Sequence, residues 1–191
     1  MSKGENEIVY SRNTVEFVTV AAEFCAFLEQ SEGRKRRDFV DTMLKLLPLL
    51  YLKASLVPHV EGDEEFYPEE FVTEQDYEYL RAMLSAIMAG EDDYMDLNNQ
   101  DVRFSDEPVV RSVSEDLADI YQALKNFVET YRLGVEYNMA EAVVAVAERF
   151  GLYWGQEVAD VLKALHRVKY RPSESDDEDE ERDTPVEDDE F

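Results

Sequence analysis

The sequence predicts an all-α fold: an irregular bundle of about six helices, followed by an acidic C-terminal tail that we expect to be disordered. Apolar residues recur at intervals of three and four along most of the chain, which is the period of helices with one buried face. Capping residues and glycine or proline breakers divide the chain into segments of helical length. The apolar runs at 57–60 and 109–110 are too short for convincing strands.

The first two predicted helices cover residues 14–30 and 35–55. Asn13 is the expected N-cap of the first helix, because an acidic residue follows three positions later. Pro48 lies inside the second helix, where it removes a hydrogen bond and clashes with a preceding carbonyl. We therefore expect a kink or a break in the second helix at that point.

A third helix is predicted to start at the Thr73 cap and to end near Gly90. Irregular connections flank it at 57–72 and 91–111, where proline, glycine and asparagine are frequent. Connections of this length are either functional or mobile.

The last three predicted helices follow one another closely. Ser112 caps the fourth helix, and Gly134 ends it. Asn138 is the expected cap of a fifth helix, which Gly151 closes, and a sixth covers residues 154–169. Because the connections are short, we expect these three helices to pack as antiparallel neighbours. A stack of helical repeats is the alternative arrangement, although the sequence has no fixed repeat.

The predicted domain organisation is a flexible N-terminus at 1–12, a single helical domain at 13–171 and a disordered acidic tail at 172–191. From residue 173 onward the chain holds twelve acidic residues and one arginine, so this segment carries −11 of the net charge of −26 and leaves −15 for the rest. The tail has too little apolar content to offset the entropy cost of ordering.

The net charge of −26 bears on the class of partner. Such a surface repels nucleic acid phosphates and anionic lipid, so we expect neither nucleic acid nor membrane binding. A basic protein is the expected partner, and the affinity should fall with salt. Mimicry of nucleic acid at a basic site is a variant of this hypothesis, and solubility alone is the alternative. The oligomeric state is left open.

Cys25 is the only cysteine, so an intramolecular disulfide is impossible. It lies in an apolar run without basic neighbours in sequence, which favours a core position over a nucleophile. The start of the chain has no apolar signal sequence, and the chain has no apolar stretch long enough for a transmembrane helix. We therefore expect a cytoplasmic protein.

Carboxylates are the candidate metal ligands. Glu115, Asp116 and Asp119 are three and four positions apart on the fourth helix, and Glu157 and Asp160 are three apart on the sixth. Carboxylate pairs at this spacing bind divalent metals in some helical enzymes. Acids in the first turn also complement the helix dipole, which accounts for the first two without a ligand.

The segment from Glu157 to Asp160 resembles the second metal-binding half of the helical nucleotide pyrophosphatases, but a matching first half is missing. Phosphate-binding glycine loops and nucleophile elbows are also absent from the sequence. The leading prediction is therefore a non-enzymatic interaction domain whose acidic surface and tail engage a basic partner, with no cofactor. A metal-dependent hydrolase is the alternative.

A run of four basic residues, Arg34 to Arg37, is conspicuous in so acidic a chain. It lies at the start of the second helix, and the N-terminal end of a helix is the less favourable end for cations. The run either pairs with the acidic tail or an acidic partner, or is simply solvated.

The segment at 112–125, with the sequence SVSEDLADIYQALK, resembles the signature stretch of a bacterial family of small helical proteins catalogued as domain of unknown function 5063. The segment at 153–155 and the acidic connection before the fourth helix are also similar to that family. The resemblance covers residues 13–169 and implies an all-helical bacterial cytoplasmic domain. It implies no activity, ligand or site residue.

Overall fold

The computed structural model of the chain describes residues 8–58, 60, 62–63, 66, 68–96 and 109–171. Residues 1–7 of the predicted flexible start at 1–12 lie outside these residues, and so does the predicted disordered tail at 172–191. The described part is mostly helical, as predicted. Its α-helices are α2 (Arg12–Glu29), α3 (Arg36–Ser55), α4 (Glu74–Met88), α5 (Val113–Arg132), α6 (Glu136–Arg149) and α7 (Gly155–Tyr170).

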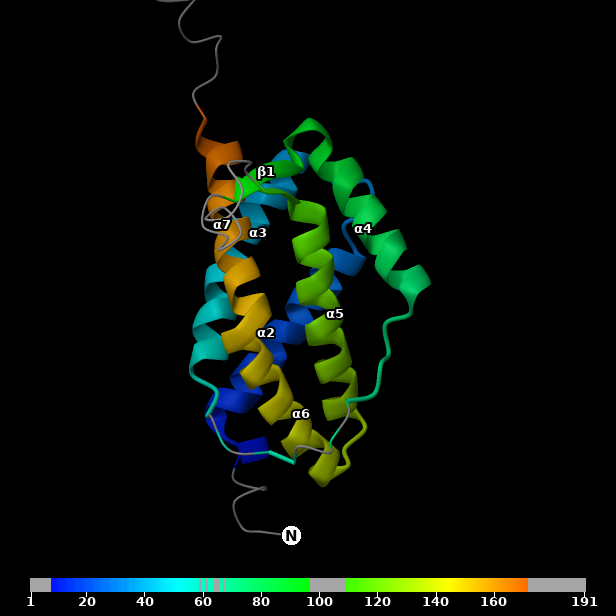
Figure 1. Ribbon diagram of the computed structural model, residues 1–191, viewed down its shortest axis with the longest axis vertical. Helices are drawn as coiled ribbons and strands as arrows, with labels where there is room; N and C mark the ends of the chain where they lie inside the picture. The colour runs from blue at the N-terminus through cyan, green and yellow to red at the C-terminus, as the bar shows by residue number, and fades with distance from the viewer. Residues whose placement is uncertain are drawn as a thin grey trace, which may run out of the picture.

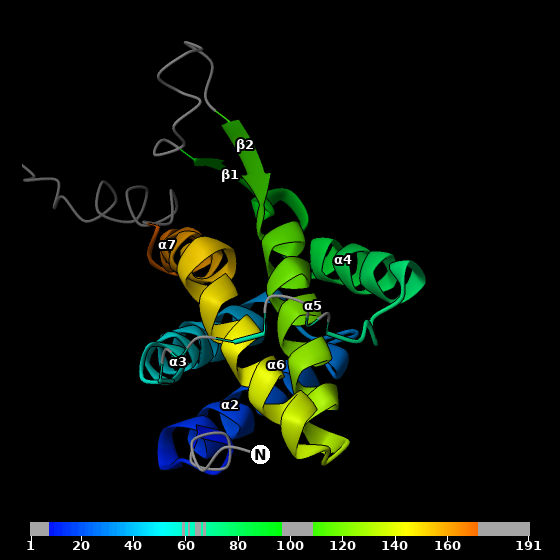
Figure 2. The same cartoon turned by 60° about the horizontal axis from the view of Figure 1, so that its bottom comes forward.

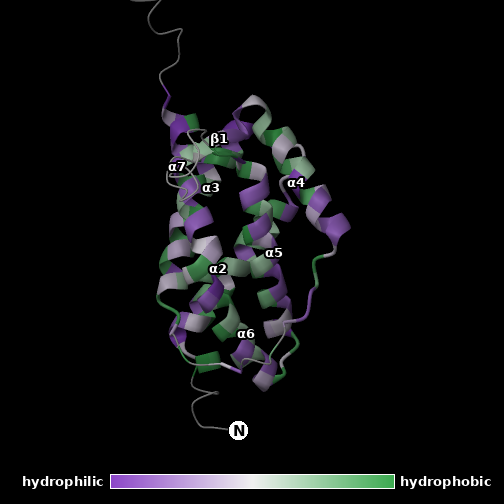
Figure 3. Ribbon diagram, in the orientation of Figure 1, coloured by the Kyte–Doolittle hydropathy of each residue, from purple (hydrophilic) through white to green (hydrophobic). Residues whose placement is uncertain are grey.

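Helix α5 is the centre of the bundle. It packs against α2, α4, α6 and α7, while α3 packs against α2 and α7 (Figure 1). Each helix carries both hydrophobic and hydrophilic residues, as expected of helices with one buried face (Figure 3). The largest buried side chains include Trp154, Phe17 and Phe24, and the Phe17 ring stacks on Trp154 with centroids 6.2 Å apart.

Two of the predicted caps are confirmed. The Thr73 side chain accepts a hydrogen bond from the Asp76 amide and Asp76 bonds back, which completes a capping box at the start of α4. At the start of α5, the Ser112 side chain accepts from the amide three residues later. Gly134, with φ of 73°, follows the C-terminal end of α5. This left-handed conformation favours glycine.

The predicted cap of the first helix is wrong by two residues. Ser11 is the N-cap of α2 and accepts from the Thr14 amide, whereas the Asn13 side chain donates to the Leu56 carbonyl 3.0 Å away. The packed chain also starts earlier than residue 13, because Ile8 and Val9 are buried in the core. Helix α3 is unbroken through Pro48, so the predicted break does not occur there.

Helices α6 and α7 are consecutive parts of one rod, which corrects the prediction that they pack as antiparallel neighbours. A π-helical turn, η3 (Phe150–Trp154), connects them without a break (Figure 1). Gly151 lies within this turn and does not end the helix. The predicted cap at Asn138 is also wrong, because α6 starts at Glu136 with Val135 at the N-cap position.

A two-stranded hairpin corrects the expectation that the chain has no strands. Strands β1 (Asp93–Asp96) and β2 (Val109–Ser112) are antiparallel and extend beyond the N-terminal end of α5 (Figure 2). A short 3-10 helix, η1 (Ala89–Glu91), leads from α4 toward β1. The register places Tyr94 opposite Arg111, and β2 continues directly into α5. The hairpin therefore brings both side chains to the first turn of α5.

None of the described helices is long and apolar enough to cross a membrane.

Candidate functional site

Three of the five predicted carboxylates come together where α5 meets α7. Asp116 is buried, with 1% of its surface exposed. Its Oδ1 accepts hydrogen bonds from Arg111 Nε at 3.1 Å and from Arg111 Nη2 at 2.5 Å. The Tyr94 hydroxyl donates to the other carboxylate oxygen. Both oxygens of Asp116 are thus bound by side chains of the hairpin.

Glu157 and Asp119 lie beside Asp116 and Arg111. Burial, together with the negative charges of Asp119 and Asp116, raises the pKa of Glu157 to about 7. Arg111 offsets only part of this increase in pKa. Its Nη2 lies 3.5 Å from Glu157 Oε1 and also binds Asp116. The Asp119 carboxylate accepts from the Tyr77 hydroxyl at 2.7 Å.

The other two predicted carboxylates lie apart from this cluster. Glu115 is exposed in the first turn of α5. Asp160 accepts from Gln156 at 3.1 Å and lines a different cavity. Within the described residues, no group of three or more aspartate, glutamate, histidine or cysteine side chains is close enough to hold a metal ion.

A cavity of about 450 Å³ adjoins the cluster, with Asp119 and Glu157 in its wall. Its other lining residues are Pro68, Glu70, Gln122, Ala123, Asn126, Arg149, Tyr153 and Trp154. Asn126 has a structural task there, because its side-chain oxygen accepts from the Phe71 and Val72 amides at 2.8 and 3.1 Å. Two adjacent carboxylates in a cavity can exchange a proton or hold a cation.

A larger depression, which we call the acidic groove, lies between α6 and the connection that follows α3. Its volume is about 860 Å³. The groove is lined by Pro58, Val60, Gly62, Asp63, Phe66, Glu141, Val144, Ala145, Ala147, Glu148, Gly151 and Leu152. These twelve residues include three carboxylates and no cation, and most of the others are apolar.

The wall of the acidic groove is tied to α6 by specific contacts. The Asp63 amide donates to Glu141 Oε2 at 2.8 Å, and the Tyr137 hydroxyl donates to Asp63 Oδ2 at 2.7 Å. A Cβ atom on Gly62 would lie 2.8 Å from Val144 Cγ1, so only glycine allows this approach. The connection therefore contacts α6 directly.

Sequence reasoning missed the acidic groove. The available signal was the acidic connection at 57–72, which was predicted to be functional or mobile. Nothing in the periodicity of α6 indicated that this helix would face that connection. Leu152 shows 63% exposure and Val60 shows 49%, so apolar surface remains open to solvent at the groove.

Two other predicted features have clear positions. Cys25 is 2% exposed, and burial raises the pKa of its thiol to about 12, which suits a core residue and not a nucleophile. In the basic run, the Arg34 guanidinium lies 4.9 Å above the Phe27 ring, and Arg36 donates to the Met88 carbonyl at 3.1 Å. Half of the run is thus engaged within the chain.

The fold and these sites define a helical domain with an acidic groove and a buried carboxylate cluster. The chain belongs to the family described as domain of unknown function (DUF5063), which matches residues 8–171. It is also similar to protein BF1032 from Bacteroides fragilis, whose crystal structure is known, with 47% identity and a TM-score of 0.75. That similarity covers 85% of this chain and 99% of the other. No curated protein matches the chain.

Proposed function

We propose that this protein is a non-enzymatic interaction domain in the cytoplasm that engages a basic partner through its acidic surface and tail, with the acidic groove as the contact site. The observation that carries the proposal is the lining of the groove, which has three carboxylates, no cation and apolar side chains such as Val60, Val144 and Leu152. In a cavity of this composition, the carboxylates attract positive charge while the apolar side chains provide contact area.

The partner that fits this chemistry is a segment with basic and apolar side chains on the same face. Apolar anchors that enter a pocket provide most of the binding energy, and charges mainly set the association rate and the specificity. An amphipathic basic helix places its apolar residues at intervals of three and four, which is a recurring mode of groove recognition. A protein whose basic site otherwise binds nucleic acid is one such partner. Competition between this chain and DNA for that protein would identify it.

The experiment uses a fluorescent amphipathic peptide of about 18 lysine and leucine residues as the probe, with anisotropy as the readout. Leu152→Asp removes an apolar contact and Glu148→Lys reverses a charge of the groove. We expect Leu152→Asp to weaken binding at least about tenfold, since one buried leucine contributes roughly 1.5–3 kcal/mol. Glu148→Lys should weaken binding by repelling the basic probe. Glu23→Lys, on the exposed face of α2, is the control with an equal charge change.

The Glu23→Lys control distinguishes binding in the acidic groove from general attraction to the net negative charge. If Glu23→Lys weakens the probe as much as Glu148→Lys, the protein binds cations by its net charge alone, and the assignment of the groove fails. We expect Glu23→Lys to change the affinity less than about twofold, because this exposed residue does not line the groove and its charge is screened by salt.

A metal-dependent hydrolase is the second candidate function. The observation that favours it is the cavity with Asp119 and Glu157 in its wall. This candidate predicts that magnesium, manganese or zinc raises the melting temperature, and that Asp119→Asn abolishes the effect. The interaction domain predicts no shift with any of the three ions, since Asp116 is already bound by Arg111 and Tyr94.

A further inference from the structure

The last helix presents a basic face in this acidic chain. Lys163 and Arg167 are four residues apart and lie on the same side of α7, and Arg171 follows directly after the end of the helix. They line a cavity of about 480 Å³, which we call the α7 basic cavity. Its other lining residues are Tyr94, Met95, Asp160, Ala164, His166 and Tyr170.

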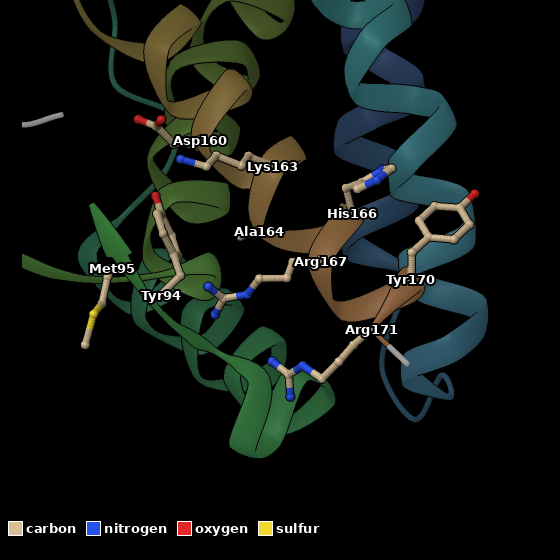
Figure 4. Close-up of a pocket in the computed structure, with 9 residues that line it drawn as sticks. All are labelled: Tyr94, Met95, Asp160, Lys163, Ala164, His166, Arg167, Tyr170 and Arg171. Atoms are coloured by element: carbon tan, nitrogen blue, oxygen red, sulfur yellow. The ribbon is translucent and has the colours of Figure 1, made fainter. Parts of the chain in front are cut away.

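The cationic groups point to the hairpin side of α7. In Figure 4 the side chains of Arg167 and Arg171 extend toward β1, whereas His166 and Tyr170 lie on the other side, toward α3. Lys163 extends toward Asp160, the one acidic residue among the lining residues (Figure 4). The cavity thus has three permanent cations and one carboxylate, the reverse of the acidic groove.

Lys163 and Arg167 form no ion pair within the described residues, so part of this positive charge is available. Arg171 pairs with Glu91 at 3.1 Å, and Asp160 accepts hydrogen bonds from Gln156. The nearby Lys169 faces away, to Asp41 on α3 at 2.5 Å. An anionic occupant is therefore the chemical counterpart of the α7 basic cavity.

We propose that the acidic tail of the same chain, residues 173–191, docks in the α7 basic cavity. The tail starts two positions after Arg171, which itself lines the cavity. It carries twelve acidic residues against one arginine. Nineteen residues span about 60 Å when extended, whereas α7 rises only about 12 Å between Lys163 and Arg171. The tail therefore has ample length to follow the basic face.

Tethering favours the tail over a free anion. A segment joined to its site by a short linker has an effective concentration in the millimolar range. Carboxylates also accept bidentate hydrogen bonds from guanidinium groups, of which the cavity has two. The inference is independent of the acidic groove, because the two sites share no residue.

This contact gives the tail a second role. In the free protein, the tail neutralises the basic face of α7 and holds its own charge close to the bundle. A strongly basic partner competes with α7 for the tail. Binding of that partner would expose the α7 basic cavity.

The experiment places a nitroxide spin label on the tail of the full chain at Thr184→Cys and records amide signals by NMR. Cys25 remains in place, since it is only 2% exposed and inaccessible to the label. We expect strong broadening of the amides at 163–171 in low salt. The broadening should disappear in about 0.5 M salt, where screening acts within about 4 Å.

Charge reversal locates the docking site. The double variant Lys163→Glu, Arg167→Glu should abolish the broadening. The control Lys35→Glu, Arg37→Glu makes the same charge change in the basic run at the start of α3 and should preserve it. The inference is overturned if no broadening occurs, or if the control variant removes it and the α7 variant does not, which would place the tail on the basic run.

Two checks keep the result unambiguous. Melting curves of both variants establish that each is folded, and Lys163→Gln, Arg167→Gln provides a milder change for the same readout. A mixture of two samples tests whether the contact is intramolecular. One protein carries the spin label without isotope enrichment, and the other is isotope-enriched without the spin label. Broadening in that mixture would mean that tails dock on other copies, and it would overturn docking in the same chain.

Discussion

Glu157 is predicted to destabilise the folded protein above neutral pH. Its pKa rises from 4.5 to about 7 on folding because the side chain is buried beside Asp119 and Asp116. A raised pKa means that the folded state binds the proton more tightly, so stability falls as the pH rises from about 4.5 to about 7. The difference corresponds to roughly 3 kcal/mol above pH 7.

The variant Glu157→Gln removes this penalty, because glutamine is neutral and similar in shape to the protonated acid. We expect it to raise the free energy of unfolding by roughly 2–3 kcal/mol at pH 8 and to have little effect at pH 4.5. Urea unfolding at a series of pH values measures both. Glu23→Gln on the exposed face of α2 controls for the loss of one negative charge.

Two outcomes would refute this reasoning about Glu157. A gain in stability that is independent of pH would show that the carboxylate is not the group that titrates. A loss of stability at pH 8 would show that the contact with Arg111, at 3.5 Å, outweighs the cost of burial.

Three further substitutions test the contacts that shape the sites. Gly155→Ala should cost about 1–3 kcal/mol of stability, since its Cβ would lie 2.4 Å from the Phe150 carbonyl oxygen. Gly151→Ala is the control and should be tolerated, because a Cβ there would have no described atom within 4 Å. Urea unfolding measures the stability of both variants. Asn126→Ala should cost about 2–3 kcal/mol, because two backbone amides at 2.8 and 3.1 Å lose their acceptor, and calorimetry measures the loss. Tyr94→Phe should cost about 1–3 kcal/mol by removing a donor to a buried carboxylate, with faster amide exchange in the hairpin as a second readout.

Local capping signals predicted the fold well where they act on their own helix. Thr73 and Ser112 start α4 and α5 as the sequence indicated. Asn138 is not a cap because α6 starts two residues earlier, and Glu141, three residues after Asn138, accepts a hydrogen bond from the Asp63 amide of a distant connection. A tertiary contact replaced the local one, and the sequence around Asn138 carries no sign of it.

The remaining errors share the same cause, which is dependence on contacts between distant segments. Gly151 looked like a helix end, yet the rod continues through the π-helical turn, where Trp154 packs in the core and its indole donates to the Val146 carbonyl at 3.1 Å. The hairpin was missed because its strands have four residues each and are separated by residues 97–108. Short strands are recognised by their partner and not by their own pattern.

The sequence predicted only part of the carboxylate cluster. Helical spacing placed Asp116 and Asp119 near each other on α5, but the approach of Glu157 depends on how α7 packs against α5. The sequence also gave no sign that Arg111 and Tyr94 would occupy Asp116 from the hairpin. That occupation places Asp116 in an ion-pair network, whereas the sequence offered it only as a candidate metal ligand.

The measurement that tests the proposed function most directly is an amide chemical-shift map of the protein during titration with the basic amphipathic probe peptide. A specific acidic groove predicts saturable shifts concentrated at Asp63, Val144, Glu148 and Leu152, which line it. The shifts should persist when the tail is removed. Shifts spread evenly over the acidic surface, or lost together with the tail, would contradict the assignment of the groove as the contact site.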